Sequence, residues 1–185
     1  RGGGGLRLRV REIFESNKIL TRQTADSIIA TIDTNNYFYS NTIHGTIIKD
    51  DTFEIKFILS ILNSNVLKYY YRQTTSEGGK VFAQVKIEIL RQMPIKITEK
   101  LKQTSFVILV DYLLHLYNKE NPAILLHTDN TRIASHLEDI LNMMVYELYF
   151  EEHMKEIDLD VLQFVTPVIE NLQNLPIEQQ IKELY

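Results

Sequence analysis

Short runs rich in isoleucine and threonine stand between polar turns in the first half of the chain. Residues 18–22 and 27–32 predict two strands around a polar turn. Residues 37–48 predict a third strand, and Gly45 within it marks a bulge or a close approach to the backbone. This part of the chain therefore favours a small sheet, either antiparallel or mixed.

Apolar residues at helical spacing follow the third strand. Asp51 with Glu54 three residues later resembles a capping box, and apolar positions then recur with helical periodicity from Phe53 to about Tyr71. We expect this helix to pack on the sheet. After the glycine pair 78–79 the chain has a strand pattern over 80–86 and a short helical turn to Arg91.

The second half has only helical patterns. They cover residues 104–117, 131–155, 159–172 and 177–185, with N-cap candidates at 129–131 and prolines at 122, 167 and 176 that separate the segments. The predicted class is α+β: a small mixed or antiparallel sheet packed on a helix, followed by an acidic helical lobe. The predicted division is a linker or appended stretch at 1–12, an α/β core at 13–97 and a helical lobe at 98–185.

Composition narrows the class of protein further. With 185 residues and 44% apolar content, the chain can bury a substantial core. It has no cysteine, which excludes disulfides and thiol chemistry and fits a reducing compartment. No apolar run approaches the roughly 18 residues that span a bilayer. We therefore expect a soluble, cytoplasmic protein without a membrane partner.

Charge is divided unevenly along the chain. Residues 1–100 carry 15 Lys and Arg against 10 Asp and Glu, which gives +5, while residues 101–185 carry 5 against 14, which gives −9. A cationic binding surface joined to an acidic helical half produces this asymmetry, because affinity for phosphate depends on local charge density. Chance scatter over two solvated surfaces is the alternative.

Motifs for catalysis are absent from the sequence. It contains no glycine-rich phosphate loop, GxSxG, HExxH or CxxC. The five histidines have no ligand spacing, and the acidic residues at 147, 151, 152 and 156 are typical of a solvated helix face. We expect no catalytic site, metal or cofactor in this chain and no small-molecule substrate.

The basic half carries the candidate binding residues. Consecutive helical residues point about 100° apart, so Tyr69, Tyr70 and Tyr71 cannot all enter one core. A tyrosine ring with Arg72 beside it could stack on a base and pair with guanine, or it could belong to an ordinary tyrosine belt between core and water. The predicted strand 80–86 offers lysine and glutamine on one face, which suits base reading and also an ordinary polar strand.

Several pieces of the first half together resemble a known family, the TaqI-like C-terminal specificity domain of adenine-N6 DNA methyltransferases and type IIG restriction-modification enzymes. The resemblance covers about residues 13–97, and the pieces that carry it are residues 18–33, 40–42, 61–64, 69–72, 79–86 and 93–95. The tail, including residues 145–149, is similar to the helical ending of the larger fused enzymes. One departure is Ala25, where relatives often have glycine and a positive φ would be strained.

The resemblance implies a non-catalytic target-recognition domain that binds double-stranded DNA beside the methyltransferase domain of the same polypeptide. S-adenosylmethionine, and Mg²⁺ where the parent also cleaves DNA, would bind in other domains; the family's Asn-Pro-Pro-Tyr motif does not occur here, since all four prolines stand alone. The residues expected to contact DNA are Lys18, Arg22, Gln23, Thr24, Asn41, Tyr71, Arg72, Gln73, Lys80, Gln84 and Lys86.

Two other functions stay open from the residues alone. The tyrosines and acidic helices could dock other protein domains without reading bases, in which case any DNA binding would be insensitive to salt. A hidden nuclease would need carboxylates and lysine around a metal, and metal-dependent cleavage by the pure chain would reveal it.

Overall fold

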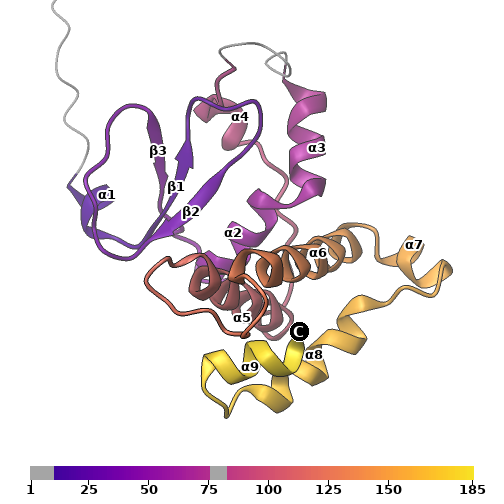
Figure 1. Cartoon of the computed structure of the whole chain (residues 1–185). Helices are drawn as coiled ribbons and strands as arrows, with labels where there is room; N and C mark the ends of the chain where they lie inside the picture. Colours follow the sequence, from indigo (N-terminus) through magenta and orange to yellow (C-terminus); the bar gives the residue numbers. More distant parts are fainter. Residues whose placement is uncertain (1–10, 76–82) are drawn as a thin grey trace, which may run out of the picture.

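The computed structural model describes residues 11–75 and 83–185, which fold into a small sheet and a set of helices (Figure 1). The strands are β1 (Lys18–Arg22), β2 (Ala30–Asp33) and β3 (Ile43–Thr46). The helices are α1 (Glu12–Glu15), α2 (Ile55–Asn63), α3 (Asn65–Thr74), α4 (Ile87–Leu90), α5 (Lys100–Tyr117), α6 (Asn130–Tyr149), α7 (Glu151–Glu156), α8 (Val161–Leu172) and α9 (Ile177–Leu184). The α+β class predicted from the sequence is confirmed.

The sheet is antiparallel with β1 in the middle, in the order β2-β1-β3. The predicted strand 18–22 is confirmed, whereas the pairing of β2 begins only at Ala30 and the predicted strand 37–48 is reduced to Ile43–Thr46. The close approach expected at Gly45 is confirmed, because a Cβ there would overlap the hydroxyl of Tyr39. The chain therefore needs glycine at this point of β3.

The single helix predicted from Phe53 to Tyr71 is wrong, because Ser64 divides it into α2 and α3. Ser64 is extended, with φ −67° and ψ 155°; its hydroxyl donates to the Ile61 carbonyl (2.7 Å) and accepts from the Leu67 N–H (3.2 Å). One side chain thus ends the first helix and caps the second. The predicted capping box is also wrong: the N-cap of α2 is Glu54, and no side chain caps it.

The strand predicted over 80–86 is replaced, in its described part, by a single β-bridge. Residues 80–82 lie outside the described residues, and Gln84 pairs with Thr24 in an isolated antiparallel bridge. The short helical turn expected before Arg91 is confirmed as α4.

The second half is helical as predicted, with two corrections. The helix predicted over 131–155 is interrupted at Phe150, which separates α6 from α7. Pro167 lies inside α8 instead of separating two segments. The predicted cap Asp129 is confirmed, since its carboxylate accepts the Thr131 N–H at 2.9 Å.

Helix α2 lies between the sheet and α5, so one apolar cluster extends through both halves of the chain. Phe57 of α2 and Phe106 of α5 meet edge to face, with ring centroids 5.2 Å apart. The α5–α6 pair then carries α8 and α9 on its far side (Figure 1). The division at residue 97 into core and lobe stays a prediction. Among the described helices, none has the length and apolar character that crossing a membrane requires.

Candidate nucleic-acid interface

Residues that follow β1 form a junction between three parts of the chain. The Gln23 N–H donates to the Thr42 carbonyl (2.9 Å) just before β3, and the Gln23 carbonyl accepts the Val85 N–H (2.7 Å). Thr24 pairs with Gln84 in the β-bridge. Backbone bonds therefore fix the segments 22–24, 41–43 and 83–86 against one another, although up to about sixty residues separate them in sequence.

The end of α3 is held to this junction by a tyrosine. Leu67 and Tyr71 lie one helical turn apart and are both buried, and the Tyr71 hydroxyl donates to the Gln84 carbonyl at 3.2 Å. Arg72 and Gln73 follow at about 100° and 200° around the helix and are exposed. The prediction that three consecutive tyrosines cannot share one core is confirmed: Tyr71 is buried, while Tyr69 is 68% exposed.

Tyr71, which the sequence predicts to contact DNA, is buried and presents no ring surface to a duplex. Its ring belongs to the core, and its hydroxyl positions Gln84. Sequence reasoning took the wrong tyrosine of the run for the surface, because the phase of the helix relative to the core was not known.

Lys18 also lies apart from the expected surface. It begins β1, at the opposite end from Arg22, and its ammonium is buried against Asp33 with 2.6 Å between Nζ and Oδ2. The Phe14 and Ser16 carbonyls accept further bonds from Nζ at 3.2 and 3.4 Å. A buried, paired ammonium contributes to the fold and cannot contact a polyanion outside.

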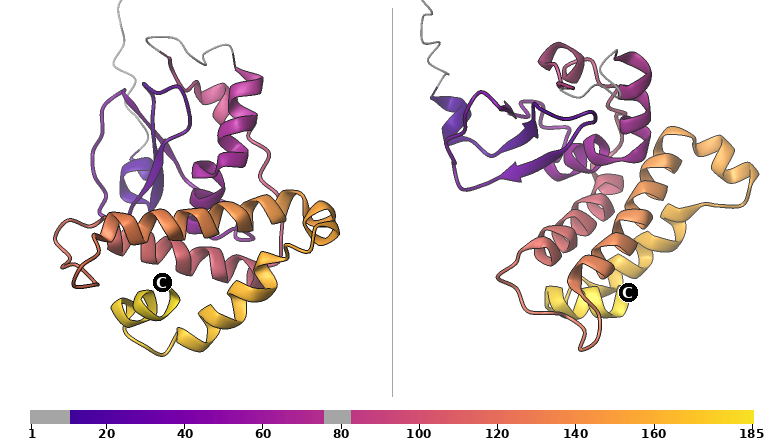
Figure 2. Two further views of the ribbon diagram at one scale, coloured as in Figure 1. Left: turned by 45° about the vertical axis from the view of Figure 1, so that its right-hand side comes forward. Right: turned by 45° about the horizontal axis from the view of Figure 1, so that its top comes forward.

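The other expected residues that the structure describes gather at one end of the molecule. Those that are exposed are Arg22, Thr24, Asn41, Arg72, Gln73, Gln84 and Lys86, while Gln23 is partly buried. Lys80 lies outside the described residues. The β1–β2 connection, the end of α3 and α4 lie at the end of the fold away from α8 and α9 in all three views (Figures 1 and 2). Helices α8 and α9 of the acidic helical half are thus turned away from this surface.

Two residues join this surface that sequence reasoning did not select. Arg91 is exposed at the C-cap of α4, one short helix after Lys86, so both ends of α4 present a cation. Asp26 holds Arg72 loosely, with 3.9 Å between its carboxylate and the guanidinium, and both groups are more than half exposed. The charge and spacing of Lys86 and Arg91 were visible in the sequence, whereas the Asp26 contact depends on the fold.

The connection after β1 is free of the strain that Ala25 could have introduced. Among the described residues other than glycine, only Asn36 and Asp158 have positive φ. A turn with alanine at residue 25 therefore costs nothing in backbone strain.

Comparison with known protein families finds a match to this part of the chain. Residues 5–95 match the family model of the TaqI-like C-terminal specificity domain, which confirms the resemblance seen in the sequence. The match contains every residue of the surface described above and ends before α5. No curated protein matches the chain.

Proposed function

We propose that this chain recognises a target sequence in double-stranded DNA, as the specificity part of a restriction-modification enzyme. The observation that carries the proposal is the junction of 22–24, 41–43 and 83–86 beside the end of α3, which groups arginine, lysine, glutamine and asparagine on one surface within the matched residues. These side chains are the types that contact base edges and phosphates in duplex DNA.

The chemistry of the surface suits both kinds of DNA contact. Arg22 and Arg72 can each give two parallel bonds to guanine, and Gln84 can do the same for adenine. Lys86 and Arg91 can pair with phosphates along the backbone. The backbone bonds of the junction hold the segments that carry these side chains in place. Fewer residues therefore need to become ordered when DNA binds.

The full enzyme is a wider proposal that rests on the same match. We propose that it methylates adenine at N6, in the manner of type IIG restriction-modification enzymes, and that this chain is its non-catalytic part. The methyltransferase domain of the same polypeptide would bind S-adenosylmethionine, with Mg²⁺ required where the parent also cleaves DNA. We propose a cytoplasmic location, where such an enzyme meets DNA.

Fluorescence anisotropy with a labelled duplex tests the proposal on the 185-residue chain. Each phosphate contact should contribute about −0.9 to the slope of log affinity against log salt. Arg72→Ala and Lys86→Ala should each weaken binding, and loss of a phosphate contact should reduce the steepness by about 1. Lys182→Ala, an exposed lysine on α9, is the matched control and should change nothing. If both surface variants bind like the unaltered chain, the surface is assigned wrongly.

A docking function is the second candidate, and exposed apolar side chains in the helical half favour it. Ile97 and Leu101 beside the start of α5 are 76% and 73% exposed, and Phe164 on α8 is 67% exposed. Docking by this part predicts DNA binding that is absent or insensitive to salt. A second experiment replaces this whole 185-residue chain, within the full enzyme, by the corresponding part of a relative. The exchange distinguishes DNA recognition from docking, because only a recognition domain carries its target sequence with it.

A further inference from the structure

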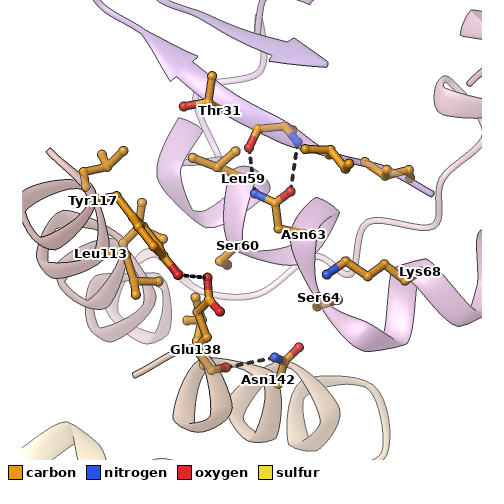
Figure 3. Close-up of a pocket in the computed structure, with 16 residues that line it drawn as sticks. Thr31, Leu59, Ser60, Asn63, Ser64, Lys68, Leu113, Tyr117, Glu138 and Asn142 are labelled. Atoms are coloured by element: carbon orange, nitrogen blue, oxygen red, sulfur yellow. Dashed lines mark hydrogen bonds between the residues drawn. The ribbon is translucent and has the colours of Figure 1, made fainter. Parts of the chain in front are cut away.

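A pocket of about 380 Å³ lies where β2, the edge strand of the sheet, meets the helical half (Figure 3). Its walls come from β2, α2, α3, α5 and α6. The apolar part of the lining includes Ile28, Leu59, Val110, Leu113, Leu114 and Leu141. This volume is within the range of small-molecule sites, which are also mostly apolar.

Lys68 brings one positive charge into this apolar pocket. Its side chain extends from α3 toward the middle of the pocket and is partly buried (Figure 3). Within residues 11–75 and 83–185 its ammonium has no hydrogen-bond acceptor and no ion pair, unlike Lys18 and Lys56. A partly desolvated ammonium without a partner favours an anion beside it.

The opposite wall carries one carboxylate. Glu138 on α6 accepts a hydrogen bond from the Tyr117 hydroxyl at 2.8 Å through Oε1 (Figure 3). Burial, together with this bond and the charge of Glu138, raises the pKa of Tyr117 to about 12, so the hydroxyl stays a donor even well above neutral pH. Tyr117 thereby fixes the carboxylate and leaves Oε2 to accept from another donor.

Two asparagines make the walls rigid. Asn63 bonds both to the N–H and to the carbonyl of Ala30, each at 2.9 Å, and Asn142 accepts the Asn65 N–H (2.8 Å) while donating to the Glu138 carbonyl (2.9 Å). Their amides are engaged by the backbone and are not needed by a ligand. The pocket is therefore formed before any ligand enters it.

We propose that this pocket binds a small organic molecule with an apolar body, a single anionic group that pairs with Lys68, and an N–H or O–H group that donates to Glu138. The apolar body replaces water against the leucine and isoleucine side chains. Molecules with several negative charges are excluded, because Glu138 would repel the second charge. This site is separate from the DNA surface and does not depend on the function proposed for that surface.

Titration with 8-anilinonaphthalene-1-sulfonate tests the proposal, since this fluorescent probe has aromatic rings, one sulfonate and one N–H. The 185-residue chain should bind it saturably at one site. Lys68→Met keeps most of the unbranched side chain, removes the ammonium and its charge, and should lower the affinity about tenfold or more. Lys182→Met makes the same change on α9, away from the pocket, and should leave affinity unaltered.

A second variant fills the pocket and leaves its charges in place. Leu113→Trp should abolish saturable binding while circular dichroism shows unchanged helix content. If Leu113→Trp fails to fold, the comparison of Lys68→Met with Lys182→Met decides alone. The proposal is overturned by the absence of saturable binding, or by binding that Lys68→Met leaves as strong as before, which would indicate adsorption elsewhere. DNA affinity should be the same in Lys68→Met and the unaltered chain.

Discussion

Removal of the Lys18 charge should lower the free energy of unfolding far more than removal of an exposed charge. Lys18 and Asp33 are 0% and 3% exposed, with 2.6 Å between Nζ and Oδ2. In Lys18→Met the Asp33 carboxylate stays buried with only the N–H groups of Asn35 and Tyr37, at 2.8 and 2.9 Å, as donors. Breaking a buried pair costs about 3–5 kcal/mol, and these two bonds place the cost near the lower end.

Urea unfolding followed by circular dichroism measures this effect. With a slope of about 2 kcal/mol/M, a loss of about 3 kcal/mol moves the midpoint down by about 1.5 M. Lys18→Met with Asp33→Asn removes both charges and keeps one acceptor, so it should be more stable than Lys18→Met by at least about 1 kcal/mol. Lys182→Met, the exposed control, should stay within about 0.5 kcal/mol of the unaltered chain. A midpoint shift below about 0.5 M for Lys18→Met, or no recovery in the double variant, would refute the reasoning.

The same pair predicts how stability depends on pH. Burial alone raises the pKa of Asp33, but the bond from Lys18 and the N–H groups of Asn35 and Tyr37 outweigh it and hold the pKa below its ordinary value. Its contribution is therefore complete above about pH 4, where the unfolded chain ionises, and is lost as pH falls through the lower folded value. The double variant lacks this carboxylate, so its free energy of unfolding should fall less between pH 5 and pH 3 than that of the unaltered chain. Urea titrations repeated at several pH values measure this difference.

Three further variants test other parts of the fold by the same urea assay. Glu147, which the sequence predicts on a solvated helix face, is buried, and burial raises its pKa. Glu147→Gln should therefore stabilise the protein at pH 7 and lose this advantage below about pH 4, where the unfolded carboxyl is protonated. Asn63→Leu removes both bonds to Ala30 at the edge of β2 and should cost about 1–3 kcal/mol, whereas a cost near zero would show that water replaces the amide. Gly45→Ala places a methyl against the Tyr39 hydroxyl and should cost about 1–3 kcal/mol, part of which Tyr39→Phe should restore.

The sequence correctly predicted those helices and strands whose first and last residues are set by their neighbours in the chain. The strand at 18–22 and the cap Asp129 were visible because alternation and capping involve neighbours in sequence. The break at Ser64 was not visible, because α2 and α3 both turn apolar residues to the core and helical spacing continues through it. Only the bonds of the Ser64 hydroxyl show that one helix ends there and another begins.

Residue types in the sequence predicted which side chains form the candidate surface, and their positions in the fold then removed some of them from it. Antiparallel pairing places Lys18 opposite Asp33, but the predicted strands 18–22 and 27–32 ended before Asp33 and gave no signal of this partner. The bridge of Thr24 with Gln84 had no such signal either, since no local pattern specifies a contact across sixty residues. Composition could suggest a cationic surface, but its outline needed the three-dimensional pairing.

On the proposal that this surface reads DNA, Tyr71 and Lys18, which lie apart from it, would help its remaining side chains to read a sequence specifically. Specific reading requires side chains that keep their positions without DNA, because ordering them on binding reduces affinity. Tyr71 supplies that order by bonding to the Gln84 carbonyl from within the core, while Lys18 fixes the far end of β1, the strand that ends in Arg22. Loss of either should therefore weaken recognition through the position of Gln84 or Arg22, with the number of phosphate contacts, and hence the salt slope, unchanged.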